Sequence, residues 1–309
     1  MISKASATAA SLPAAPSAAR SLALLGEYWE LTKPRLSMLS VLTAVVGYLA
    51  AKPAPHFGIV ACLLLGTTSA AFGAGVLNQW LEREIDTRMA RTRGRPLPSG
   101  AVSPNAALLF GLVLSSCGPL VLWFGVNGLS ALLALATLVS YLFVYTPMKR
   151  HTPWCTLVGS IPGALPPLIG SAAAAGHITP LGWILFGVLF SWQIPHFFAL
   201  AWTYRRDYAQ ARLPMSTVVD PTGRLAARDS LLFTVALVIC SLLPVALGLA
   251  GFVYGLVALA IGSWFLHRAW KFARADETTR DLPARRLFLA SLAYLPLTLA
   301  ALVVDRLLG

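Results

Sequence analysis

Residues 58–86 read GIVACLLLGTTSAAFGAGVLNQWLEREID. The first twenty residues of this stretch carry no charge, whereas the last nine carry four charged side chains. About 20 apolar residues are enough for a helix to cross the hydrocarbon core of a bilayer. The stretch therefore predicts a transmembrane helix with acidic side chains at its end.

The rest of the chain repeats the apolar half of this pattern. Of the 309 residues, 57% are hydrophobic and 12% are charged, and soluble domains usually carry about twice that charged fraction. The runs are continuous rather than alternating, which favours helices over a barrel. We expect an all-α membrane protein, a bundle of about nine transmembrane helices in a single domain over residues 27–309. The predicted spans are 36–52, 58–77, 106–124, 128–146, 156–174, 181–201, 230–248, 252–268 and 287–305.

The positive charges indicate the orientation of the bundle. All but Lys52 and Arg306, which is 22 of the 24 Lys and Arg residues, lie in the amino-terminal tail and in every second loop. The positive-inside rule places these segments in the cytoplasm, or in the matrix of a mitochondrion. We expect the inner (plasma) membrane of a bacterium, with the mitochondrial inner membrane as the alternative.

The net charge of +12 does not indicate nucleic acid as a partner. A protein that binds nucleic acid displays its basic residues on a soluble face, and here they fill short gaps between apolar runs. Residues 1–26 are rich in Ala, Ser and Pro without a continuous apolar core, so we expect a disordered cytoplasmic tail rather than a cleaved signal peptide. A transit peptide is the alternative.

The acidic residues need a second explanation, because Asp and Glu contribute little to orientation. Asn78, Glu82 and Asp86 are four residues apart, and this spacing places them on one stripe of a helix. Two carboxylates and an amide oxygen suit Mg²⁺, which leaves its other positions to water and substrate phosphate. The alternative is a solvated helix end at which the acids pair with Arg83 and Arg88.

Two neighbouring segments carry further charge. Arg88, Arg91, Arg93 and Arg95 lie within eight residues, and arginines make two-point contacts with phosphate. A topological anchor or a patch for anionic lipid is the alternative. Asp207 follows the sixth apolar run as Glu82 follows the second, so it is either another metal ligand or a surface acid.

Two further sets of polar residues belong to the fourth and sixth runs. Tyr145, Lys149 and Arg150 come at the end of the fourth run, on the side that carries the acids. His196 lies inside the sixth run, where an ionisable residue is by default a functional candidate. It could ligate iron, act as a base, stack on a substrate or simply bond to a neighbouring helix.

These segments together resemble the UbiA superfamily of intramembrane aromatic prenyltransferases. PPLIG at 166–170 and WQIPHF at 192–197 resemble the branch that acts on haem rather than those acting on quinones or chlorophylls. Two positions depart from the pattern: Glu82 stands where Asp is more common, and Arg212 where glycine is usual. The matching segments are 32–35, 78–86, 91–97, 145–150, 163–170, 192–197 and 207–215.

The resemblance implies transfer of the farnesyl group of farnesyl diphosphate to the 2-vinyl group of haem B, with addition of water, giving haem O and diphosphate. It implies Mg²⁺ as cofactor, with haem B as a substrate, and haem A synthase or terminal-oxidase assembly proteins as partners in the bilayer. Another aromatic acceptor, such as a quinone precursor, is the alternative. A cation transporter fits less well, because transporter sites usually lie near the midplane. The implied metal ligands are Asn78, Glu82, Asp86 and Asp207; Lys149 is a further catalytic residue; and substrate-binding residues are Arg35, Arg91, Arg93, Arg95, Tyr145, Arg150, His196 and Tyr208.

Overall fold

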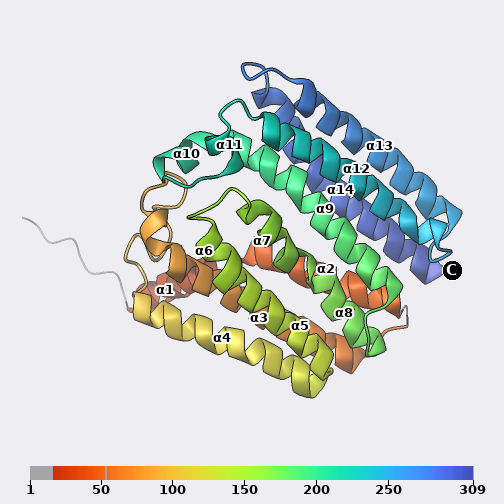
Figure 1. Cartoon of the computed structure of the whole chain (residues 1–309). Coiled ribbons are helices and arrows are strands. Elements are labelled where there is room, and N and C mark those ends of the chain that lie inside the picture. Colours follow the sequence, from red (N-terminus) through yellow and green to blue (C-terminus); the bar gives the residue numbers. More distant parts are fainter. Residues whose placement is uncertain (1–16, 53, 309) are drawn as a thin grey trace, which may run out of the picture.

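The computed structural model describes residues 17–52 and 54–308, and within these ranges every regular element is a helix (Figure 1). Nine segments are long and apolar enough to cross a membrane, which confirms the nine predicted spans for the described residues. They are α2 (Pro34–Ala51), α3 (Phe57–Asp86), α4 (Pro104–Gly125), α5 (Gly128–Val139) with η1 (Ser140–Tyr145) and α6 (Thr146–Met148), α7 (Cys155–Ala164) with α8 (Pro166–Ala175), α9 (Pro180–Thr203), α12 (Arg224–Ala246), α13 (Phe252–Arg274) and α14 (Asp281–Leu308).

Three shorter helices complete the chain: α1 (Ser17–Leu31), α10 (Arg205–Gln210) and α11 (Ser216–Val219). The disordered tail predicted for residues 1–26 needs a correction at its end. Residues 1–16 lie outside the described residues, but 17–26 belong to α1. The Ala and Leu residues that follow Ser17 favour a helix, and the prediction gave too little weight to them.

The spans form two groups that meet around a central space. Helices α9, α12, α13 and α14 share one large apolar core, which includes Trp192, Phe265 and Tyr294. Helices α2, α3, α4, α5 and α8 share a second core around Tyr48 and Leu122. Figure 1 shows the two groups side by side, with α10 and α11 at one end of the bundle and the carboxyl terminus at the other.

Glycines allow the helices around this space to approach closely. A Cβ atom on Gly170 of α8 would overlap the carbonyl oxygen of Ala44 on α2, and one on Gly163 of α7 would overlap the side-chain oxygen of Gln193 on α9. Small residues serve the same purpose in other membrane helix pairs. Residues 163–170 of the fifth span therefore pack closely against both α2 and α9. The helix of this span is interrupted at Leu165, directly before two prolines.

Candidate active site

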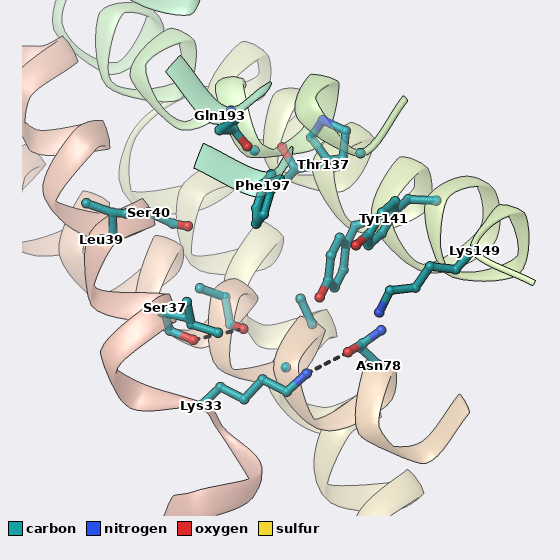
Figure 2. A pocket seen from close by; sticks show the side chains of 18 of the residues that line it. Lys33, Ser37, Leu39, Ser40, Asn78, Thr137, Tyr141, Lys149, Gln193 and Phe197 are labelled. Atoms are coloured by element: carbon teal, nitrogen blue, oxygen red, sulfur yellow. Dashed lines mark hydrogen bonds between the residues drawn. The ribbon is translucent and has the colours of Figure 1, made fainter. Parts of the chain in front are cut away.

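A cavity of about 420 Å³ lies between α2, α3, the fourth and fifth spans and α9. One end is polar and is bordered by Lys33, Asn78 and Lys149, as Figure 2 shows. Towards the other end the wall becomes apolar and aromatic, with Phe197 and Leu39. The cavity therefore connects a charged end, which we call the mouth, to an apolar interior.

The polar end is built on a single uninterrupted helix. Helix α3 continues past the predicted end of its span at residue 77 as far as Asp86, so the four-residue spacing of Asn78, Glu82 and Asp86 becomes one face. All three line the cavity, and their exposed fractions are 2%, 6% and 1%. We call this set the α3 stripe. Burial rules out the solvated helix end that the sequence left open.

Three cations from three different segments pair with the α3 stripe. Lys33, directly before α2, donates to Asn78 Oδ1 at 2.6 Å. Lys149, directly after α6, donates to Glu82 Oε1 at 2.8 Å. Arg95, in the loop after α3, donates to Asp86 Oδ2 at 2.7 Å. Buried carboxylates need such partners, because an unpaired buried charge is strongly destabilising.

The α3 stripe has an oxygen atom that is free to bind a metal ion. Asp86 Oδ1 is buried and has no hydrogen-bond partner among the described residues. Within the same part of the chain, no three His, Cys, Asp or Glu side chains gather as a metal site. The stripe offers two carboxylates and one amide oxygen, a hard-oxygen set that fits Mg²⁺ if phosphate and water supply the remaining ligands.

The two lysines at the mouth differ in their protonation. Burial, with the nearby Arg95 charge, lowers the pKa of Lys33 to about 7, although the Glu82 and Asp86 carboxylates act in the opposite direction. Burial alone would also lower the pKa of Lys149, but the Glu82 carboxylate raises it well above its ordinary range. Lys33 therefore loses its proton more readily than Lys149.

Of the five predicted arginines, two line the cavity and three do not. Arg91 and Arg95 line the cavity, and the Arg91 guanidinium lies 5.3 Å from the ring centre of Tyr204. Arg35 and Arg93 are exposed and do not line it. Arg150 is also exposed and donates to the backbone oxygen of Leu81 at 2.8 Å.

Asp207 does not line the cavity with the α3 stripe, so its role as a metal ligand stays a prediction. It lies half-buried on the short helix α10 and does not line the cavity, whereas its neighbour Tyr208 does. Adjacent helical residues point about 100° apart, so the inward face given to Tyr208 leaves Asp207 turned aside. The α9–α10 junction is tied instead to α14, since Arg205 pairs with Asp281 at 3.0 Å.

Arg212, which departs from the family pattern, lies in the turn after α10. Arg212 has a φ angle of +55°, in the left-handed region that favours glycine. The arginine therefore adopts a conformation that glycine would take more readily, at a cost of roughly 1 kcal/mol. Lys33 has a similar φ of +50°, immediately before Pro34, which disfavours the ordinary helical conformation at this position.

Aromatic rings cover the wall between the mouth and the interior. Tyr141 and Tyr145 stack with ring centres 5.4 Å apart, on a π-helical turn that interrupts the fourth span. Lys149 lies 5.5 Å from the centre of the Tyr145 ring. π-helical turns are frequent at functional sites. Deeper in the cavity, His196 lies against Trp192, with ring centres 4.9 Å apart.

Some residues of the site were missed by the sequence reasoning. Lys33 stands at the edge of an apolar run, and that position is the sequence signal that could have identified it. Tyr141 lies one turn before Tyr145 and shares its face. Thr146 accepts from Asn78 Nδ2 at 3.1 Å, a contact between residues 68 positions apart that no local pattern announces.

Comparison with known proteins agrees with this geometry. A family model described as the UbiA prenyltransferase family matches residues 40–292. The protoheme IX farnesyltransferase of Opitutus terrae is 51% identical over 285 residues, which cover 92% of this chain and 96% of that protein. The protein of the same description from Solibacter usitatus is 45% identical and covers 91% of this chain and 98% of its own length.

Solved structures share the fold at low sequence identity. A structure of digeranylgeranylglyceryl phosphate synthase superposes with a TM-score of 0.79 at 18% identity, covering 93% of this chain and 99% of its own. A UbiA homologue from Archaeoglobus fulgidus bound to DMAPP and Mg²⁺ has a TM-score of 0.65 at 15% identity, covering 90% and 99%. The predicted family and fold are confirmed: the chain belongs to the UbiA prenyltransferase family and is a prenyltransferase.

Proposed function

We propose that the chain transfers the farnesyl group of farnesyl diphosphate to the 2-vinyl group of haem B, with addition of water, and releases haem O and diphosphate. One observation carries the proposal: a single cavity joins a buried acid stripe ringed by cations to an apolar chamber that contains a histidine. Relatives at 40–51% identity are protoheme IX farnesyltransferases, which supports haem O synthesis.

The polar end is suited to the diphosphate. Asn78, Glu82 and Asp86 would hold Mg²⁺, which when bound supplies positive charge to the departing diphosphate. Among the residues that the structure describes, Asp86 Oδ1 has no hydrogen-bond partner to give up before it coordinates a cation. Lys149 and Arg95 already lie against the stripe, so they would neutralise phosphate charge as the carbon–oxygen bond breaks, an effect often dominant in catalysis.

The apolar wall is suited to the cation that this cleavage leaves. The bonding electron pair departs with diphosphate, and the allylic carbon becomes positive. Tyr141 and Tyr145 present aromatic faces beside the mouth, and such faces attract cations. The vinyl π electrons then form the new carbon–carbon bond, and water adds to the resulting cation and loses a proton. Exclusion of bulk water until that point prevents early quenching.

The aromatic interior is suited to the porphyrin. His196, Trp192 and Phe197 line it, on the half of α9 that follows the middle of the span. We further propose that the mouth faces the cytoplasm, since nearly all Lys and Arg residues lie at that end. The bacterial plasma membrane fits this orientation, and haem A synthase or oxidase assembly proteins would then receive the product.

An assay of product formation tests the proposal. Membranes that contain the protein are incubated with haem B, farnesyl diphosphate and Mg²⁺, and the haems are separated by chromatography. We expect haem O and diphosphate in equal amounts, with much less of both from Glu82→Gln. The matched control is Glu84→Gln, since Glu84 lies on the same helix but is exposed.

Two outcomes would contradict haem as the acceptor. Prenylation of a quinone precursor, with haem B unchanged, would favour the other aromatic branch. No product from either acceptor, with the protein intact in the membrane, would contradict an enzymatic role for the cavity and leave a cation pathway to be tested by flux measurements.

A further inference from the structure

His196 is held by contacts from two helices. Its Nδ1 atom lies 2.7 Å from Ser291 Oγ of α14. Its ring lies 4.9 Å from the ring centre of Trp192 on its own helix and 4.9 Å from that of Phe288 on α14. One stacked ring, one tilted ring and a hydrogen bond at one nitrogen restrict the plane of the imidazole.

Ser291 decides which nitrogen carries the proton. Its hydroxyl also lies 2.6 Å from the backbone oxygen of Phe288, and a carbonyl oxygen can only accept. A serine hydroxyl has one hydrogen, so if that hydrogen goes to Phe288, Ser291 Oγ must accept from His196. Only a proton on Nδ1 satisfies both contacts, and in the neutral ring Nε2 then carries a lone pair.

The backbone of Ser291 is itself held in place. Trp192 Nε1 donates to its carbonyl oxygen at 2.8 Å, in a fully buried contact. Trp192 therefore stacks on His196 and also positions the residue that orients it. Such a chain of contacts leaves the imidazole little freedom to rotate or to change tautomer.

Nε2 is the atom left for an occupant of the cavity. Across the described ranges, no hydrogen bond is made by this nitrogen, and the residue lines the cavity. Histidines that ligate metals almost always donate their other ring nitrogen to an oxygen acceptor. The Nδ1–H···Oγ contact reproduces that arrangement.

We propose that Ser291 is a positioning residue that fixes the Nδ1–H tautomer of His196, so that Nε2 ligates the iron of the haem substrate. The inference rests on the proposed function, since it takes haem B as the acceptor. Axial ligation anchors the porphyrin at one atom, while Trp192 and Phe288 fix the direction of that bond.

Iron spectroscopy on the purified full-length protein tests the inference without relying on turnover. Haem B is titrated into the wild type, and the ferrous complex is examined for its iron–histidine stretching band by resonance Raman. We expect His196→Gly to lose the band and added imidazole to restore a similar one. We expect Ser291→Ala to keep ligation, lower the stretching frequency and weaken haem affinity about tenfold.

Matched variants separate positioning from general damage. Ser230→Ala removes another buried serine that donates to a helix carbonyl, Ala226, away from the cavity, and we expect wild-type spectra. Ser291→Thr keeps the hydroxyl and should restore the frequency. If Ser291→Ala does not fold, Ser291→Cys, whose sulfur is a weak acceptor, must shift the band in the same direction.

The failures of the inference and of the proposed function are distinguishable. An unchanged iron–ligand band in His196→Gly, or an unshifted one in Ser291→Ala and Ser291→Cys, overturns the inference while haem O formation still supports the function. A wild type that neither binds haem nor forms haem O overturns both.

Discussion

Two segments that each follow a transmembrane span and carry acidic residues place those residues in different surroundings. The segment at 78–86 follows the second span, and that at 207–215 follows the sixth. On α3 the acids are buried, face the cavity and are paired with cations. On α10 the acid is half-buried and turned away from it.

Helix continuity explains the difference. Helix α3 runs unbroken for 30 residues, so residues four apart stay on one face. Helix α9 ends at Thr203, and α10 restarts two residues later with a new axis. The spacing of charged residues therefore predicts a shared face only where the helix that carries them continues.

The largest expected effect is at Asp86. Asp86→Ala removes an oxygen that has no other partner and leaves Arg95 unpaired, so we expect haem O formation to fall by on the order of 10²–10³-fold. Turnover is measured under saturating substrates, with Glu84→Gln as the exposed control. Retention of most activity would show that the stripe serves only to hold the helices together.

Variants of Glu82 test whether the α3 stripe needs a carboxylate at this position or only a side chain of similar size. Glu82→Ala deprives Lys149 of its partner, and we expect a loss of about 100-fold. Glu82→Asp keeps the charge with a shorter reach and should lose about tenfold or less. The ratio of the two rates is the measurement, and equal losses would argue against metal ligation at this position.

Arg91 and Arg93 form a matched pair two residues apart. Arg91 lines the cavity and Arg93 does not. We expect Arg91→Gln to raise KM for farnesyl diphosphate about tenfold, since it removes a charge-assisted contact, and Arg93→Gln to leave KM unchanged. Equal effects of the two variants would mean that the whole loop acts through its charge alone.

The smallest effect is expected at Asp207. Asp207→Asn should change turnover by no more than about fivefold, as is usual for a partly exposed charge. Haem O formation by this variant is compared with that of Asp86→Asn in the same membranes. Similar losses in both would restore Asp207 to the metal site and would require α10 to move when substrate binds.

The sequence was sufficient for most of the fold. Nine apolar runs predicted nine spans, and the second run predicted the α3 stripe because one continuous helix has a fixed period. The position of Asp207 could not be predicted, since it depends on where a helix breaks and on Tyr208 taking the inward face. The roles of Lys33 and Thr146 depend on contacts with Asn78 across 45 and 68 residues, which no local pattern contains.

Binding of Mn²⁺ together with an unreactive thiolo analogue of farnesyl diphosphate tests the central claim most directly, with electron paramagnetic resonance as the readout. The account predicts that the wild type and Asp207→Asn bind the ion in the presence of the analogue and that Asp86→Asn does not. Wild-type affinity in Asp86→Asn, or loss of binding in Asp207→Asn alone, would contradict a metal–diphosphate site on α3.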